Sequence, residues 1–328
     1  MKILVTGGTG FLGEHVARAL LAHEHHVVIS GRNFAQAQPL IEAGAIPIRA
    51  DLADSEATID SCRGVDAVCH VGALSSPWGR REEFFAANVS GTAAVIEGCR
   101  RHNVRRLVHV SSPSVLFDGR DHLNLTEAAP YPHRFVSEYS RTKKLAEDLV
   151  NAATGVPAVI LRPKAIFGPG DRALLPRLVA AARAGRLPQI GNGQNRVDLT
   201  YVDNVVRAIL LALDSDAAVG KTYTITNDEH PLLWEVIRTV LMRLGIAPNL
   251  RRVPLSLALA AAAVMEWRAA FTHREPLLTR YAVGILARTQ TYDISAAKRD
   301  LGYGPQITVA EGIERTLLYC QRPPISLF

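Results

Sequence analysis

Three polar side chains in the first half of the chain have the chemistry and the order needed for proton transfer at a hydroxyl group or a ketone. Tyr139 and Lys143 stand four positions apart, which places both on one face of a helix. A free phenol has a pKa of about 10, and a neighbouring ammonium group favours the phenolate, so Lys143 is expected to lower the pKa of Tyr139. Ser112 follows an apolar strand and is expected to hold a substrate oxygen beside the phenol. Together the three residues predict an acid-base site.

These residues need a scaffold, because a tyrosine and a lysine at this spacing also occur as a surface pair on any helix. The chain begins with a short apolar strand that runs directly into a turn with Gly7, Gly10 and Gly13, and an apolar helix follows. Glycine at such positions permits a tight turn and close approach of the backbone to a pyrophosphate, while the helix N-terminus offers free N–H groups. Tight turns also use glycine for steric reasons alone. The position between strand and helix favours a dinucleotide site.

The second strand carries the residues that select the cofactor. A carboxylate at its end would accept hydrogen bonds from the adenosine ribose, but the chain has Gly31, Arg32 and Asn33 there. Arg32 either faces solvent or pairs with a 2′-phosphate through charge-assisted hydrogen bonds. We therefore expect NADP(H) in preference to NAD(H), which stays open. Asp51, after the third strand, is placed either to accept from the adenine amino group or to cap a helix.

The elements that must position these residues alternate along the chain. Short β-branched runs and helical segments follow one another through the N-terminal half, as in a parallel sheet with helices on both faces. We expect an α/β fold, with a doubly wound Rossmann domain at 1–168, to which the chain returns at 196–227, and a smaller, mostly helical substrate lobe at 169–328. The expected strands span 2–6, 26–30, 46–49, 67–71, 106–111, 158–162, 196–201 and 221–226, and helices are expected at 174–184 and from 203.

The composition is that of a folded protein with two lobes. At 328 residues, 48% of them hydrophobic and 21% charged, the chain exceeds the usual size of a single core and is not disordered. The net charge of +6 is scattered along the sequence, without an aromatic and basic platform, so no nucleic-acid partner is expected. The four cysteines lie far apart and indicate reduced thiols, and no cleavable leader is visible at the start. We expect a cytoplasmic protein.

Other polar and apolar segments have simpler interpretations. The run His23-Glu24-His25-His26 has no cysteine or further carboxylate grouped with it, so no metal is expected. His70 and His109 belong to strands, where core histidines are common, and Tyr131 either touches substrate or forms part of a loop. The most apolar stretch, 255–264, is too short to span a bilayer and reads as a packed helix. A wall of the substrate pocket or a peripheral contact with a membrane stays open for it.

With these residues in view, the chain is similar to the extended short-chain dehydrogenases/reductases over essentially its whole length. The likeness rests on motifs distributed from the first strand to the final turn, and together they are highly specific. They are the glycine turn at 6–13, Asp51-Leu52, His70-Val71-Gly72-Ala73, Asn88-Val89-Ser90-Gly91-Thr92, Ser111-Ser112, Tyr139 with Lys143, Leu161-Arg162-Pro163, Phe167-Gly168-Pro169-Gly170-Asp171, Tyr201-Val202-Asp203-Asn204 and Leu301-Gly302-Tyr303.

The resemblance implies a role for each residue of the acid-base site. Ser112 polarises the substrate oxygen, Tyr139 donates or accepts its proton, and Lys143 holds the nicotinamide ribose while tuning Tyr139. A hydride would pass between the nicotinamide and a substrate carbon. The residues expected to contact the cofactor are Gly7, Thr9, Gly10, Phe11, Leu12, Gly13, Arg32, Asp51, Leu52, Val71, Gly72, Ala73, Asn88, Tyr139, Lys143 and Pro163.

Three segments, 112–115, 162–171 and 198–204, look most like the 3β-hydroxysteroid dehydrogenase branch, which includes bacterial 2-alkyl-3-oxoalkanoate reductases. This likeness implies interconversion of a hydroxyl group and a ketone on an apolar small molecule, either sterol-like or a long-chain β-hydroxy or β-keto compound. We also expect a homodimer.

Two other functions stay open. Sugar-nucleotide enzymes of the same superfamily commonly resemble Val-Tyr-Gly where this chain has Phe117, which lacks a hydroxyl group. Arg172, Arg177 and Arg196 are nevertheless available for a diphosphate, which keeps a nucleotide-sugar epimerase, dehydratase or reductase as the alternative. A dinucleotide-sensing protein without catalysis is the third function, and the intact acid-base residues argue against it.

Overall fold

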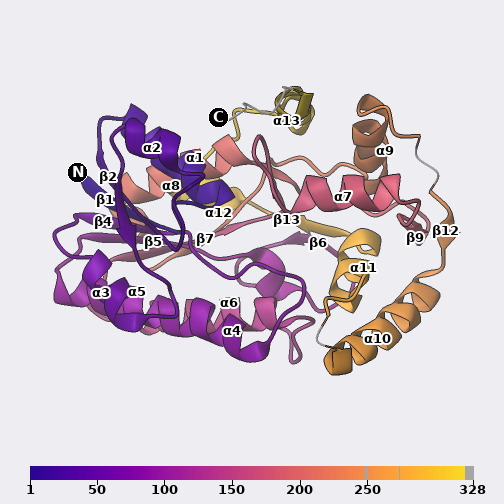
Figure 1. The fold of residues 1–328 in the computed structure, drawn as a ribbon, viewed down its shortest axis with the longest axis horizontal. Helices are drawn as coiled ribbons and strands as arrows, with labels where there is room; N and C mark the ends of the chain where they lie inside the picture. The colour runs from indigo at the N-terminus through magenta and orange to yellow at the C-terminus, as the bar shows by residue number, and fades with distance from the viewer. Residues whose placement is uncertain (248–249, 273, 322–328) are drawn as a thin grey trace.

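A parallel sheet forms the centre of the structure, a computed structural model that describes residues 1–247, 250–272 and 274–321. Its strand order is β11-β7-β5-β4-β1-β2-β3, and all neighbouring strands are parallel (Figure 1). The order reverses between β1 and β4, which is the arrangement of a Rossmann-type sheet and confirms the expected fold class. The strands are β1 (Lys2–Thr6), β2 (His26–Gly31), β3 (Ile46–Arg49), β4 (Ala67–His70), β5 (Arg106–Val110), β7 (Ala158–Pro163) and β11 (Thr222–Ile225).

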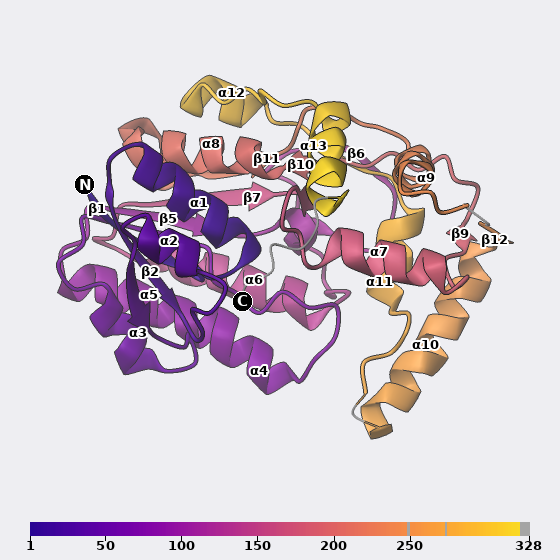
Figure 2. The ribbon, with the colours of Figure 1, turned by 45° about the horizontal axis from the view of Figure 1, so that its top comes forward.

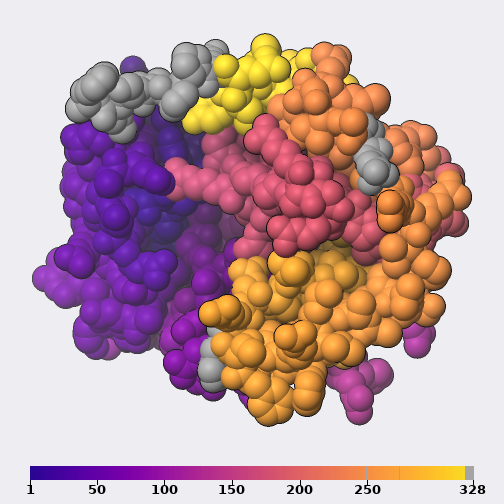
Figure 3. All heavy atoms as spheres, turned by 45° about the vertical axis from the view of Figure 1, so that its right-hand side comes forward, coloured from indigo at the N-terminus to yellow at the C-terminus, as the bar shows by residue number. Residues whose placement is uncertain are grey.

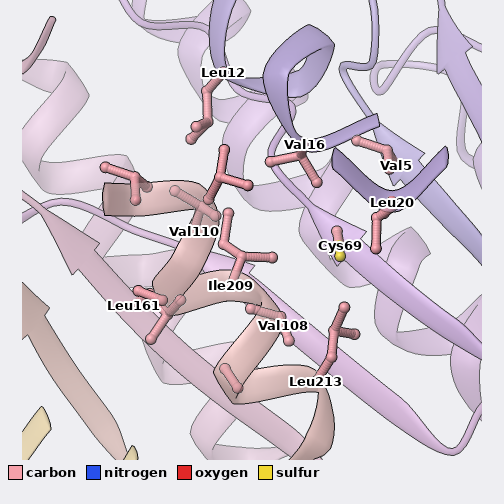
Figure 4. Packing of buried hydrophobic residues seen from close by; sticks show 14 of the residues in the cluster. Val5, Leu12, Val16, Leu20, Cys69, Val108, Val110, Leu161, Ile209 and Leu213 are labelled. Carbon is pink, nitrogen blue, oxygen red and sulfur yellow. The ribbon is translucent and has the colours of Figure 1, made fainter. Parts of the chain in front are cut away.

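The central strands are apolar on both faces because helices cover both faces. Every residue of β4, β5 and β7 is buried, as expected for strands of a parallel sheet. One face is covered by α1 (Phe11–Ala22) and α8 (Val202–Asp214), and the other by α3 (Ser55–Ser61), α5 (Gly91–Arg101) and α6 (Glu138–Ala152) (Figure 1). Figure 4 shows buried side chains between the sheet and the helices α1 and α8, among them Val16, Leu20, Cys69, Val108, Ile209 and Leu213.

The expected strands of the first half are confirmed, most of them to within a residue at each end. The strand expected at 196–201 is wrong over most of its length. Only β10 (Thr200–Tyr201) forms there, and it pairs with β8 (Ile166–Phe167) outside the main sheet. Just before β10, the side chain of Asp198 is buried and accepts a hydrogen bond from the Tyr292 backbone N–H at 2.8 Å. This bond links the segment before β10 to Tyr292 in the C-terminal part of the chain. The chain returns to the main sheet through β11 alone.

A second hydrophobic cluster lies beyond the carboxyl end of β7 (Figure 2). It contains the buried Trp234, Ile237 and Leu241, and Ala262 and Val283 pack with them. Figure 3 shows the surface hollowed between this group, coloured pink to orange, and the indigo and purple N-terminal part. The elements around the cluster are α7 (Leu174–Arg183), β9 (Gln189–Ile190), α9 (Leu233–Arg243), β12 (Arg252–Val253), α10 (Leu255–Thr272) and α11 (Arg280–Ala287).

The last two helices contact elements of the parallel sheet and of the second hydrophobic cluster. The chain ends with α12 (Ser295–Leu301), which contacts α8 and β11, and α13 (Val309–Gln321), which contacts α9 and β10. The final third is therefore helical as expected, but part of it packs back on the sheet. The other elements are α2 (Gln38–Glu42), α4 (Arg81–Phe85), a π-helical turn (Ala86–Ser90), a 3-10 turn (Pro113–Leu116), β6 (His122–Leu125), a 3-10 turn (Asp216–Ala218) and β13 (Gln290–Tyr292).

Candidate active site

The glycine turn lies at the point where the strand order reverses. Gly7 ends β1 with a φ of +65°, and a Cβ there would lie 2.6 Å from the Cα of Gly72, which follows β4. A Cβ at Gly13 would lie 2.1 Å from the carbonyl oxygen of Gly7. Neither glycine can be replaced by a residue with a side chain, because backbone atoms of Gly72 and Gly7 occupy the space that the Cβ atoms would need. The two neighbouring strands thus end in a narrow backbone turn, where open α/β sheets bind their ligands.

The N-terminus of α1 offers unpaired donors at this turn. Its N-cap is Gly10, which has no side chain to accept a hydrogen bond, and the first intrahelical bond runs from the Glu14 N–H to the Gly10 carbonyl at 2.8 Å. The backbone N–H groups of Phe11, Leu12 and Gly13 therefore have no partner within the helix. A Cβ at Gly10 would meet only the Gly7 carbonyl, at 3.2 Å. This cradle fits a pyrophosphate, which supports the expected dinucleotide site.

The adenosine side of the turn is formed by the ends of β2 and β3. Arg32 is exposed directly after β2, and a Cβ at Gly31 would meet the Thr9 side chain at 2.8 Å. The capping alternative for Asp51 is wrong, since Asp54 is the N-cap of α3 and accepts from the Ala57 N–H at 3.1 Å. The Asp51 carboxylate is exposed instead.

The ends of β5 and the beginning of α6 bring Ser112 and Tyr139 together. Ser112 follows β5 and accepts a hydrogen bond from the Ser114 N–H at 3.2 Å, and Ser137 caps α6 so that Tyr139 lies in its first turn. Tyr139 is half-buried. Burial raises the pKa of Tyr139 above its ordinary value, although the nearby hydroxyl groups of Ser75 and Ser112 act in the opposite direction. The phenol is thus a proton donor at neutral pH.

Lys143 lies on the next turn of α6 and is 2% exposed. Its Nζ donates to the Val110 carbonyl at 2.7 Å and lies 3.5 Å from Nε2 of His109. Burial lowers the pKa of Lys143 to about 8, against the opposing effect of the Glu147 charge. The expected effect of Lys143 on the phenol stays a prediction, since burial is the largest influence on the pKa of Tyr139 and the Lys143 ammonium group donates to the Val110 carbonyl.

Two buried histidines lie behind Lys143. The rings of His70 and His109 are 5.1 Å apart, and burial together with the Lys143 charge lowers the pKa of His70 to about 3. The Thr92 hydroxyl donates to the Asn88 carbonyl at 2.7 Å and therefore accepts from Nε2 of His70 at 3.0 Å, which leaves Nδ1 of the neutral ring to accept from the Thr6 hydroxyl at 2.7 Å. The histidines are therefore neutral core residues, as expected. The sequence does not reveal that His109 lies next to the Lys143 ammonium group.

Asn88 is located in the π-helical turn, and its side chain connects the segment after β4 to α6. Its Oδ1 accepts from the Leu74 N–H at 2.7 Å, while its Nδ2 donates to the Leu74 carbonyl at 3.1 Å and to Oγ1 of Thr142 at 3.0 Å. Asn88 thus fastens the segment after Ala73 to α6. Turns of this kind recur at functional sites.

A buried ion pair anchors α6 to β7. Arg162 donates from Nε and Nη2 to the two carboxylate oxygens of Glu147, at 2.8 and 2.7 Å, and both side chains are essentially inaccessible. The Tyr131 hydroxyl joins them at 2.8 Å from Nη2 of Arg162, which assigns this tyrosine to the scaffold. Glu147 is a site residue that no motif in the sequence indicates, although its position four residues after Lys143 places it on the same helix face. The pair fixes α6 next to Pro163, the last residue of β7.

A residue of α11 also reaches the site. Tyr281 of α11 packs edge-on against Phe117 with ring centroids 6.2 Å apart, and a Cβ at Gly284 would lie 2.8 Å from the Phe117 ring. Burial raises the pKa of Tyr281, with a further contribution from Tyr139, while the Ser114 hydroxyl opposes it. Tyr281 was not predictable from the sequence, because no motif surrounds it and only the fold brings α11 to the end of β5.

The arginines considered for a diphosphate have separate partners. Arg177 pairs with Glu275 at 3.2 Å, and Nη1 of Arg196 donates to the His230 carbonyl at 2.8 Å. Arg172 lies 3.7 Å from a carboxylate oxygen of Glu14. Each of the three is thus engaged by a different part of the chain.

Most of the sequence matches a family model. The match covers residues 4–257 and the model describes the 3-beta hydroxysteroid dehydrogenase/isomerase family. The chain belongs to this family. It is an NAD(P)-dependent oxidoreductase of the extended short-chain dehydrogenase/reductase type, which acts on a hydroxyl group or a ketone.

Individual relatives of this family member span nearly the whole chain. It is 38% identical to the 2-alkyl-3-oxoalkanoate reductase of Stenotrophomonas maltophilia, over 96% of this chain and 98% of the relative. It is 33% identical to the mouse sterol-4-alpha-carboxylate 3-dehydrogenase, decarboxylating, over 96% and 90%. Among solved structures, a dTDP-glucose 4,6-dehydratase from Streptomyces venezuelae with NAD bound is similar, with a TM-score of 0.78, 26% identity and 97% and 96% coverage.

Proposed function

We propose that this enzyme interconverts a hydroxyl group and a ketone on an apolar β-hydroxy or β-keto substrate, sterol-like or long-chain, with NADP(H) as its cofactor. The observation that carries the proposal is that the Ser112 hydroxyl group lies close to Tyr139, and that Ser112 and the glycine turn both follow carboxyl ends of strands in the same parallel sheet. The names of two relatives, a ketone reductase and a sterol dehydrogenase, support the substrate class.

In the direction of ketone reduction, the chain supplies the proton. Because burial raises the pKa of Tyr139, the phenol is protonated at neutral pH and donates its proton to the ketone oxygen. The Ser112 hydroxyl donates a hydrogen bond to the same oxygen, which positions it and stabilises the negative charge that develops there. In oxidation, Tyr139 accepts the proton of the alcohol.

A nicotinamide cofactor, when bound, supplies the hydride for reduction or accepts it in oxidation. We assign its pyrophosphate to the N–H groups at the start of α1 and its nicotinamide ribose to Lys143. The exposed Arg32, with no carboxylate near it at the end of β2, favours a 2′-phosphate and therefore NADP(H). Asn88 would act on the cofactor side through Leu74, whose backbone it fixes.

The surroundings of Tyr139 favour an apolar substrate. Tyr281, which packs edge-on against the buried Phe117, brings an aromatic ring next to Tyr139. A nucleotide diphosphate would need basic side chains that converge, whereas Arg172, Arg177 and Arg196 each have a partner elsewhere. The substrate lobe, built around α7, α9, α10 and α11, would thus enclose hydrocarbon.

The substrate class is tested by the rate of NADPH oxidation. We expect the wild-type enzyme to reduce a long-chain 2-alkyl-3-oxoalkanoate or a 3-oxosteroid, and to leave UDP-glucose and dTDP-glucose unchanged. The similarity to a dTDP-glucose 4,6-dehydratase at 26% identity keeps a nucleotide-sugar enzyme as the second candidate. Conversion of either sugar nucleotide, with no reaction of the apolar ketones, would overturn the proposed substrate class.

A further inference from the structure

α10 carries apolar side chains on two opposite sides. Ala258, Ala262 and Ala269 are buried on the inner side, toward α11 and the second hydrophobic cluster. The outer side presents a stripe at helical spacing that no described residue covers, and we call it the outer face. Its members are Leu257, Val264, Trp267 and Phe271, which are 60%, 59%, 65% and 69% exposed.

The position of α10 leaves the outer face available to a large partner. The helix lies along an outer edge of the molecule, on the side away from the parallel sheet (Figures 1 and 2). Leu277, in the segment that leads to α11, is also 78% exposed. A monomeric protein rarely exposes large apolar side chains together in this way unless the surface binds something.

The charges around the outer face select the partner. Arg251, Arg252, Arg268 and Arg274 are exposed close to it in the sequence. The two carboxylates of the same region are already paired, Glu266 with Arg280 at 2.6 Å and Glu275 with Arg177 at 3.2 Å. The unpaired charge is therefore positive, which complements an anionic surface.

The aromatic residues point to a lipid interface. Trp267 and Phe271 form an edge-on pair with ring centroids 5.1 Å apart, next to Arg268. Aromatic rings beside arginines are typical of the boundary between acyl chains and headgroups. We propose that α10 binds the surface of an anionic membrane, lying in its plane with the outer face inserted among the acyl chains.

Two other arrangements fit less well. A second copy related by a two-fold axis would bring the arginines near the outer face toward each other, without a free carboxylate to oppose them. The helix α10 extends beyond the apolar stretch 255–264, and by length and composition alone it could cross a membrane. Its inner side, however, packs against α11 and bears the Glu266 pair with Arg280. The helix therefore has only one side available for lipid.

The experiment is sedimentation of the full-length protein with vesicles of equal parts phosphatidylcholine and phosphatidylglycerol, with pure phosphatidylcholine for comparison. We expect wild type to sediment with the anionic vesicles, and more weakly at high salt. Trp267→Ser combined with Phe271→Ser should lower the partition coefficient on the order of tenfold or more. The matched control is Leu318→Ser with Tyr319→Ser on α13, which removes side chains of 59% and 50% exposure and should leave binding unchanged.

The ketone reductase activity of both variants with a soluble substrate should equal that of wild type, which separates this proposal from the proposed function. Wild type that stays in the supernatant, or equal binding by the two variants, would overturn membrane docking. A wild-type dimer that becomes a monomer on loss of Trp267 and Phe271, without vesicle binding, would assign the outer face to a second copy. Protein that resists extraction by alkaline carbonate would contradict the in-plane orientation.

Discussion

At the scale of residues, burial decides the chemistry of the site more than the pairing of charges does. Tyr139 and Lys143 share a helix face as their spacing predicts, yet the pKa of the phenol is raised and the pKa of the amine is lowered. The sequence predicts which residue types meet, because periodicity fixes their direction. The degree of burial of Tyr139 and Lys143 was not predictable. It depends on neighbours from the end of β5 and from the next turn of α6, namely His109, Val110 and Glu147.

The buried Lys143 makes stability depend on pH. Its pKa is about 8 in the folded protein and 10.5 when exposed, so between these values the unfolded state binds more protons and the free energy of unfolding contributed by Lys143 rises with pH. Relative to Lys143→Met, wild type should gain on the order of 3 kcal/mol from pH 8 to above 10.5. Urea denaturation of both proteins across this range measures the difference. A constant difference would show that the amine has an ordinary pKa.

The exposed Arg32 makes a prediction about cofactor selection. Arg32→Ala removes charge-assisted hydrogen bonds to a 2′-phosphate and should weaken NADPH binding by about tenfold to a hundredfold, without changing the affinity for NADH. Fluorescence titration with both cofactors gives the two dissociation constants. Arg63→Ala, which changes an exposed arginine paired with Asp60, serves as the control. An equal loss for NADH and NADPH would contradict a role at the 2′-phosphate.

At the scale of elements, the first half of the chain was predictable and much of the second half was not. Continuous apolar runs become buried parallel strands whatever surrounds them, so β1 to β7 of the main sheet lie where expected. The segment 196–201 has strand-like residues, but its buried Asp198 fixes β13 instead of a sheet edge. The placement of α11, which brings Tyr281 to Phe117, follows from long-range packing that no local pattern encodes.

The ion pair between α6 and β7 carries the element-scale prediction. Glu147→Gln leaves the Arg162 charge buried without its partner, which should lower the free energy of unfolding by about 3 to 5 kcal/mol. Chemical denaturation measures the loss. Glu147→Leu combined with Arg162→Met removes both charges and should recover much of the stability. If Glu147→Gln is as stable as wild type, the pair does not anchor α6.

At the scale of the whole molecule, the enzyme combines a dinucleotide scaffold with a second group of helices that closes over the acid-base residues and ends in the outer face of α10. The sheet positions the glycine turn and Ser112, while α11 brings Tyr281 next to Tyr139. A homodimer and a cytoplasmic location stay predictions from the sequence.

The central claim is that Tyr139 transfers the proton at a hydroxyl or ketone beside a bound dinucleotide. Tyr139→Phe keeps the ring and removes the hydroxyl, so the most direct measurement is its rate of NADPH-dependent ketone reduction, together with its dissociation constant for NADPH. We predict a rate about a hundredfold to ten-thousandfold below wild type, with cofactor affinity and melting temperature unchanged. A variant that retains the wild-type rate, or that loses activity only because it no longer binds NADPH, would contradict this account.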